Sequence, residues 1–122
     1  MSAVVPEPVR LATEPAERAG FAMSCDPGPG RLLAVLAAAV PANGRVLELG
    51  TGTGVGTAWI TGGLRGRDDV EVVTVEIDAA TAALAAQYAW PPQVRLLTGD
   101  AMEVIRSAGR FDLILSTRRR FC

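Results

Sequence analysis

Residues 48–54 read Glu48-Leu49-Gly50-Thr51-Gly52-Thr53-Gly54, and this stretch decides the fold class of the chain. It closes an apolar run, residues 45–49, that is typical of a buried strand, and it precedes a segment with helical apolar spacing. Glycines between a strand and a helix let the backbone approach a ligand closely, because no Cβ stands in the way. The helix N-terminus adds unpaired N–H donors at the same place. The sequence therefore predicts a ligand-binding loop between a strand and a helix.

Strand-like and helix-like patterns alternate on both sides of this loop. Such alternation indicates crossover connections and a parallel α/β sheet. The crossover rules give the strand order three-two-one-four, with the ligand at the carboxyl end of the first strand. The first helix is expected to bury Leu32, Leu36 and Val40, and to begin after the Pro/Gly cluster at residues 26–30. Strands are expected at residues 45–49, 70–76, 94–97 and 111–115, and helices at residues 31–40, 54–64, 79–88 and 100–107.

The loop lacks the spacing G-x-G-x-x-G/A that is typical of dinucleotide binding. Counted from Gly50, the last position of that pattern falls on Val55; counted from Gly52, it falls on Thr57. Glu48 lies inside the strand, and a carboxylate beside the loop would repel a pyrophosphate. A cationic ligand suits this carboxylate better, and S-adenosylmethionine carries both a sulfonium and an ammonium group. A nucleotide-binding oxidoreductase is therefore the weaker alternative.

Acidic residues also stand at the ends of the next two predicted strands. Glu76 follows the loop by about 20 residues, where a ribose diol finds its acceptor in a sheet of this kind. Asp100 lies in Gly99-Asp100-Ala101 after the third strand, with Glu103 three residues further on, as in a capping box. We expect Asp100 to cap the next helix and to lie beside an adenine. Without a ligand, the two acids would be a solvated strand end and a plain helix cap.

These motifs, in this order, resemble those of Rossmann-like, class I S-adenosylmethionine-dependent methyltransferases. The resemblance rests on residues 48–54, Glu76, Gly99-Asp100-Ala101 and Phe111-Asp112-Leu113-Ile114. Met23-Ser24-Cys25-Asp26 resembles the small-molecule O-methyltransferase branch, which includes catechol O-methyltransferase. The resemblance implies a Rossmann-like fold and transfer of a methyl group from a sulfonium to an oxygen of a small hydroxylated molecule. It also divides the chain into an N-terminal arm (1–20), a cofactor-binding half of a methyltransferase domain (21–115) and a basic tail (116–122).

The resemblance further implies a cofactor site, and it assigns no catalytic residue. The acidic residue of the loop and the glycine backbone would hold the methionine moiety. The carboxylate that ends the second strand would bind the ribose hydroxyls, and the acidic and small residues after the third strand would line the adenine. The Met-Ser pair near the N-terminus would close over the cofactor. The residues expected to bind the cofactor are Met23, Ser24, Glu48, Gly50, Thr51, Gly52, Thr53, Gly54, Glu76, Ile77, Gly99, Asp100 and Ala101.

The sequence departs from that family after the fourth predicted strand. In the O-methyltransferase branch this strand leads into an Asp that helps to bind Mg²⁺ or substrate, and here Thr117 stands at that position. Mg²⁺ is thus implied for the full-length family, but its ligand Asp is missing here, so no metal ligand is assigned. Residues 118–120 are three consecutive arginines, which are unusual after a buried strand. We interpret residues 116–122 as an aberrant tail, and a frameshift near Leu115 would produce one.

Composition restricts the function classes that remain. Apolar residues make up 49% and charged residues 20%, which is typical of a globular domain. A net charge of −1 gives no field that attracts nucleic acid or a membrane surface, so neither is expected as a partner. The chain has no His, so acid–base chemistry would fall to Asp or Glu. Cys25 and Cys122 form no metal-ligand pair and indicate free thiols in a reducing cytoplasm.

Two functions stay open on the sequence alone. The first is O-methyl transfer to a small hydroxylated molecule. The second is a non-catalytic module that binds S-adenosylmethionine or a partner chain. We expect the fourth strand to form an exposed apolar edge, and such an edge favours a homodimer or an aggregate.

Overall fold

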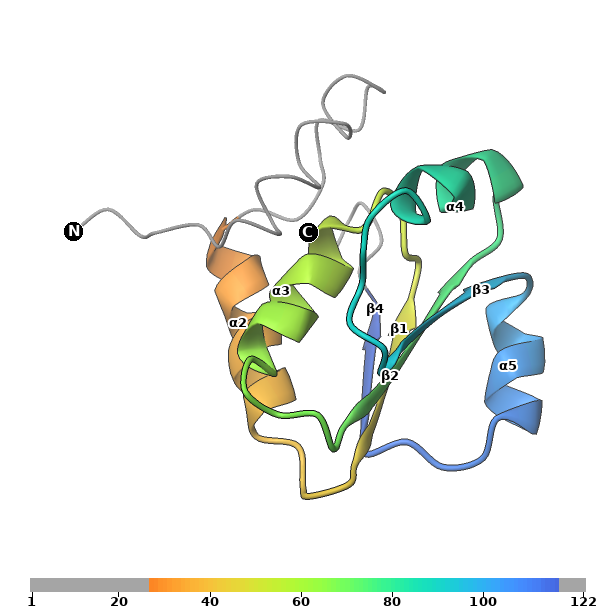
Figure 1. Ribbon diagram of the computed structural model, residues 1–122. Coiled ribbons are helices and arrows are strands. Elements are labelled where there is room, and N and C mark those ends of the chain that lie inside the picture. The colour runs from red at the N-terminus through yellow and green to blue at the C-terminus, as the bar shows by residue number, and fades with distance from the viewer. Residues whose placement is uncertain (1–26, 117–122) are drawn as a thin grey trace.

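Helices and strands alternate through residues 27–116, which are the residues that the computed structural model describes (Figure 1). The predicted arm, Met23, Ser24, both cysteines, Thr117 and the arginine run lie outside these residues. The strands are β1 (Arg45–Leu49), β2 (Glu71–Glu76), β3 (Val94–Thr98) and β4 (Leu113–Ser116). The helices are α2 (Pro27–Ala38), α3 (Val55–Gly63), α4 (Ala79–Ala85) and α5 (Ala101–Ser107).

The strands form one parallel sheet with the order β3-β2-β1-β4, which confirms the order predicted from the crossover rules. The register aligns Glu48 of β1 with Thr74 of β2, and Leu49 with Val75. The carboxyl ends of β1 and β2 therefore lie side by side. The glycine-rich loop leaves β1 at this edge of the sheet, as the sequence predicts.

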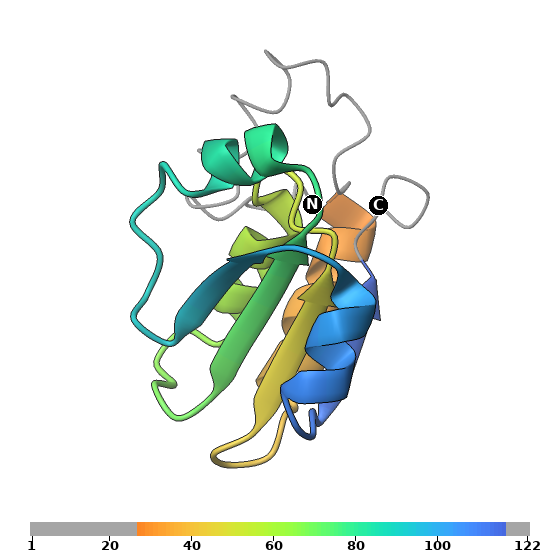
Figure 2. The same ribbon diagram turned by 90° about the vertical axis from the view of Figure 1, so that its right-hand side faces the viewer.

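Both faces of the sheet carry apolar side chains, because successive residues of a strand point to opposite faces. Helices α2 and α3 lie on one side of the sheet and α5 lies on the other, as Figures 1 and 2 show. The core on the α2 and α3 side is the larger one and includes Leu33, Val46, Ile60, Leu64, Val70, Val72 and Leu115. The core on the α5 side consists of Leu47, Val73 and Val75, with Leu49, Leu97, Val104 and Phe111 packed against them.

Helix α2 begins earlier than predicted and buries a different face. It starts at Pro27, because proline is tolerated in the first turn of a helix, where the N–H has no intrahelical partner. Leu33 and Ala37 are fully buried, whereas Leu32 and Leu36 are 52% and 37% exposed. The predicted face was therefore wrong for both of these leucines. Helix α2 instead turns Leu33 and Ala37 toward the core.

Helices α2 and α3 approach each other closely, and this approach determines which face of α2 is buried. A Cβ on Gly63 of α3 would lie only 2.1 Å from the backbone oxygen of Ala34 in α2. At the other end of the contact, a Cβ on Gly30 would lie 2.3 Å from the indole of Trp59. Small residues at this crossing bring the two backbones together, which leaves Leu32 and Leu36 on the exposed side of α2.

Boundaries outside α2 also differ from the predictions, most clearly those of α4 and β4. Helix α4 ends at Ala85 and not at Tyr88, and the indole N–H of Trp90 donates to the Ala85 carbonyl at 2.8 Å. That bond satisfies a terminal carbonyl of α4 after the chain has turned away. Strand β4 runs from Leu113 to Ser116, so it starts later than predicted and takes in the first residue of the predicted tail. Within residues 27–116, no helix is long and apolar enough to cross a membrane.

Candidate cofactor-binding site

The glycine-rich loop joins β1 to α3 at the carboxyl edge of the sheet. Gly50, Gly52 and Gly54 have positive φ angles of 91°, 57° and 102°. Residues with a Cβ rarely adopt this conformation, so the glycines are needed for the shape of the loop. Gly54 is the N-cap of α3, and a Cβ there would lie 2.8 Å from the ring of Trp90. The predicted strand-loop-helix unit is therefore present.

Backbone hydrogen bonds hold the loop against the end of β2. The N–H groups of Gly50 and Thr51 donate to the Val75 carbonyl at 2.9 and 3.1 Å. The N–H of Gly52 donates to Oε1 of Glu76 at 2.8 Å. The loop and Glu76 therefore form one unit, although 24 residues separate Gly52 from this carboxylate.

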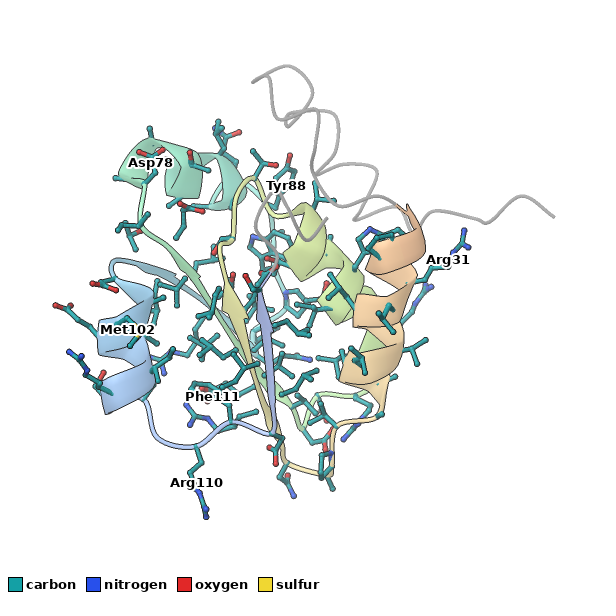
Figure 3. The ribbon with its side chains drawn as sticks, turned by 180° about the vertical axis from the view of Figure 1, so that it is seen from behind. Arg31, Asp78, Tyr88, Met102, Arg110 and Phe111 are labelled. Carbon is teal, nitrogen blue, oxygen red and sulfur yellow. The ribbon has the colours of Figure 1, made fainter. Side chains whose placement is uncertain are left out.

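Glu76 lies where the sequence predicts an acceptor for a ribose. Its Oε2 accepts the N–H of Asp78 at 3.0 Å, and each carboxylate oxygen has a further lone pair for a ligand hydroxyl. Asp78 itself caps α4 by accepting from Thr81, and these hydrogen bonds lower its pKa (Figure 3 labels Asp78). An open pocket of about 260 Å³ adjoins Glu76, and it is lined by Thr51, Glu76, Ala79, Ala82, Ala83, Ala86, Leu96, Leu97 and Thr98.

Glu48 lies in the interior, between β1, β2 and α3. Its side chain is fully buried, and its Oε1 accepts the hydroxyls of Thr57 and, at 2.6 Å, of Thr74. The hydroxyls of Thr51 and Thr74 are also 2.6 Å apart. Sequence reasoning missed Thr57 and Thr74. The one available signal was a threonine inside the otherwise apolar run of β2.

The predicted residues after β3 lie beside the same edge. The Gly99 N–H donates to the Glu76 carbonyl at 2.9 Å, which ties the ends of β3 and β2 together. Asp100 is the predicted cap of α5, and its Oδ1 accepts the N–H of Met102 at 2.8 Å. The capping-box pattern predicted a bond to the N–H of Glu103 instead. The bond goes to the residue before it, which is equally suited to an N-cap.

The other predicted site residues differ in exposure. Ala101 is half-buried in the first turn of α5, and the Ile77 side chain is 76% exposed beyond the end of β2. Thr53 is buried in the glycine loop, where its hydroxyl has no hydrogen-bond partner within the described part of the chain. Among residues 27–116, no group of three His, Cys, Asp or Glu side chains is arranged to hold a metal ion.

Known proteins are similar to this chain in both sequence and architecture. Residues 46–122 match the family model for the methyltransferase domain. The chain is 36% identical over 103 residues to a protein of Mycolicibacterium smegmatis that is described as an O-methyltransferase; the match covers 80% of this chain and 47% of that relative. The chain belongs to the methyltransferase domain family, as the sequence motifs predict. It spans about half the length, or less, of the curated relatives that it matches.

Solved structures confirm the Rossmann-like fold. A structure described as an O-methyltransferase from Klebsiella pneumoniae is 30% identical, with a TM-score of 0.72, and the match covers 91% of this chain and 53% of that chain. The O-methyltransferase TomG from Streptomyces achromogenes, solved in complex with SAM, has a TM-score of 0.78. It is 23% identical, and the match covers 96% of this chain and 56% of that chain, so this likeness shows the fold alone.

Proposed function

We propose that this chain is the S-adenosylmethionine-binding half of an O-methyltransferase that acts on a small hydroxylated molecule. The observation that carries the proposal is the unit formed by the glycine loop and Glu76. A carboxylate at this strand end accepts the hydroxyls of a ribose, and the loop lets the rest of the ligand approach the backbone. The similarity to proteins described as O-methyltransferases supports the same reaction class.

The described residues fit such a cofactor. When it is bound, S-adenosylmethionine supplies an electrophilic methyl group on a sulfonium. The chain's own contribution is binding and orientation, because a fixed geometry lowers the barrier of an in-line transfer. Glu76 would accept the ribose hydroxyls, and Asp100 and Ala101 would stand beside the adenine. A Cβ on Gly52 would meet nothing within 4 Å, so the loop leaves open space where the ligand approaches.

The described residues do not fit a resident Mg²⁺ ion, because they contain no cluster of metal-ligating side chains. We therefore assign no step to a metal, and no described residue is assigned the removal of the substrate proton. The alternative is a module that binds S-adenosylmethionine without turnover.

Calorimetry with S-adenosylhomocysteine, S-adenosylmethionine and NAD tests the proposed ligand class. We expect the two S-adenosyl compounds to bind more tightly than NAD. The chain offers a matched pair of variants, because Gly52 and Gly66 both have positive φ and open space where a Cβ would stand. Gly52→Ala should weaken binding of S-adenosylhomocysteine about tenfold, which corresponds to about 1.4 kcal/mol. Gly66→Ala should carry the same backbone strain without that loss.

Two outcomes would contradict the proposal. Tighter binding of NAD would assign the loop to a nucleotide-binding oxidoreductase instead. Equal binding by the Gly52→Ala and Gly66→Ala variants would show that the loop does not approach the ligand. A methyl-transfer assay on catechol-like substrates then separates the enzyme from the module that only binds the cofactor.

A further inference from the structure

A continuous chain of hydrogen bonds connects the interior of the sheet to the glycine loop. It runs from Glu48 to Thr74 and from Thr74 to Thr51, with oxygen–oxygen distances of 2.6 Å at both steps. A branch runs from Glu48 to Thr57 in the first turns of α3. Glu48, Thr57 and Thr74 are fully buried, and Thr51 is 4% exposed. The chain therefore lies in a low-dielectric interior, where hydrogen bonds are strengthened and unpaired groups are costly.

The direction of each hydrogen bond follows from the chemistry of the groups. Thr57 and Thr74 each donate their single hydroxyl proton to Oε1 of Glu48. Because the Thr74 proton is committed to Glu48, the hydroxyl of Thr51 must be the donor to Thr74. The buried carboxylate therefore orients all three hydroxyls. It acts on the loop through Thr74, and Thr51 is held with its side chain turned toward the sheet.

We propose that Glu48 is a positioning residue that anchors the glycine loop in its ligand-binding shape through Thr74 and Thr51. The proposal rests on the proposed function for the identity of the ligand, but the anchor itself is a property of the free protein. It gives the acidic residue of the loop motif a role that needs no direct contact with the ligand. A loop that loses its anchor spends less time in the competent shape, so the apparent affinity falls by that fraction.

Replacement of Thr74 tests the anchor, because Val keeps the shape of Thr and removes the hydroxyl. We expect Thr74→Val to raise the Kd for S-adenosylhomocysteine about tenfold, whereas Thr74→Ser should stay within about twofold of the wild type. Thr61→Val is the matched control, since the Thr61 hydroxyl donates to the Ala58 carbonyl within α3 and has no part in the chain of hydroxyls. In the ligand-free protein, Thr51→Val should add no further acceleration of Gly54 N–H exchange in the Thr74→Val background, because the two residues act in series.

Amide hydrogen exchange in the ligand-free protein gives a second readout that no cofactor affects. The Gly54 N–H, which donates to the Thr51 carbonyl at 3.0 Å, should exchange faster in Thr74→Val and at the wild-type rate in Thr74→Ser and Thr61→Val. Wild-type exchange at Gly54 in Thr74→Val would overturn the anchor, and so would additive increases of the Gly54 exchange rate in the double variant. Failure of the wild-type protein to bind S-adenosylhomocysteine would instead overturn the proposed function, while the exchange data would still decide the anchor.

Discussion

At the scale of single residues, the Glu76 carboxylate has two roles that its position at the end of β2 makes compatible. One role is structural, since it accepts the N–H of Gly52 and so fixes the loop. The other is the proposed binding of ribose hydroxyls at the neighbouring pocket. A carboxylate has about four lone-pair positions, and the N–H groups of Gly52 and Asp78 occupy only two of them.

Substitution of Glu76 should separate these roles. Glu76→Ala should cost about 1.5–3 kcal/mol of binding free energy for S-adenosylhomocysteine, because charge-assisted hydrogen bonds are lost. Glu76→Gln should cost less, since its amide oxygen still accepts the Gly52 N–H. Glu71→Gln is the control, because Glu71 is a half-buried carboxylate at the opposite end of β2. Titration calorimetry and thermal unfolding of each variant give the measurements. Wild-type affinity in a folded Glu76→Ala protein would show that Glu76 is a solvated strand end without a role in ligand binding.

The sequence predicted the glycine positions correctly but missed the threonines that support them. The backbone of the loop demands positive φ at Gly50, Gly52 and Gly54, and glycine is the residue that permits it, so local spacing is informative. The roles of Thr57 and Thr74 depend on the alignment of β1 with β2 and on the approach of α3. The register and the approach of α3 are tertiary contacts, and the spacing of residues in a single sequence does not reveal them.

At the scale of elements, a single arginine joins the end of α2 to the start of β2. The Arg67 guanidinium donates to the carbonyls of Ala38, Val40 and Pro41 at 2.6–3.2 Å, which satisfies carbonyls at and just beyond the C-terminus of α2. Arg67 also pairs with Asp69 at 2.9 Å. Hydrogen bonds from the Arg67 side chain and from the Asn43 N–H lower the pKa of Asp69 to about 2.

This shift predicts a dependence of stability on pH. The pKa of Asp69 is lower in the folded protein than in the unfolded chain, where it is about 3.9. The pair therefore stabilises the fold fully above about pH 4, and this contribution is lost as the pH falls toward 2. Urea unfolding at several pH values should show a smaller loss between pH 4 and 2 for Asp69→Asn than for the wild type. Asp68→Asn, an exposed neighbour, serves as the control, and parallel curves for all three proteins would contradict the prediction.

Element types followed from the sequence, whereas some boundaries and faces did not. The alternating pattern gave all eight described elements, because apolar periodicity reflects burial on a face. The prediction placed the start of α2 too late. Pro and Gly usually interrupt a helix, but the first turn of a helix tolerates them, and α2 starts at Pro27. Its buried face, with Leu33 and Ala37, is set by the close approach of Gly63 to Ala34, a relation between α2 and α3 that the apolar spacing within α2 does not show.

At the scale of the whole molecule, the strand order places β4 at an edge of the described sheet. Within residues 27–116, β4 pairs with β1 alone, and Ile114 on it is 52% exposed. An apolar edge strand with free N–H and C=O groups is a template for pairing with another chain. Val35 on α2, which is 64% exposed, marks a second apolar surface on a different part of the molecule.

We therefore expect the chain to form dimers or larger species through β4. Ile114→Arg should shift light scattering toward the mass of one chain, because a charge on an edge strand discourages pairing. Val35→Arg is the matched control and should leave association unchanged. If Val35→Arg disrupts association and Ile114→Arg does not, the contact between chains lies on α2 and not on β4. A monomeric wild-type protein would contradict the prediction.

Both tryptophans of the chain lie against glycines, each at a close contact between two segments of the fold. Trp59 covers Gly30 at the start of α2, and Trp90 covers Gly54 at the start of α3. Indole emission depends on the polarity around the ring, so each tryptophan is an intrinsic optical probe of one contact. In a Trp59→Phe protein the remaining fluorescence would follow the glycine loop, and in a Trp90→Phe protein it would follow the docking of α2. The intrinsic fluorescence of the chain can thus report on these two contacts separately, without any attached dye.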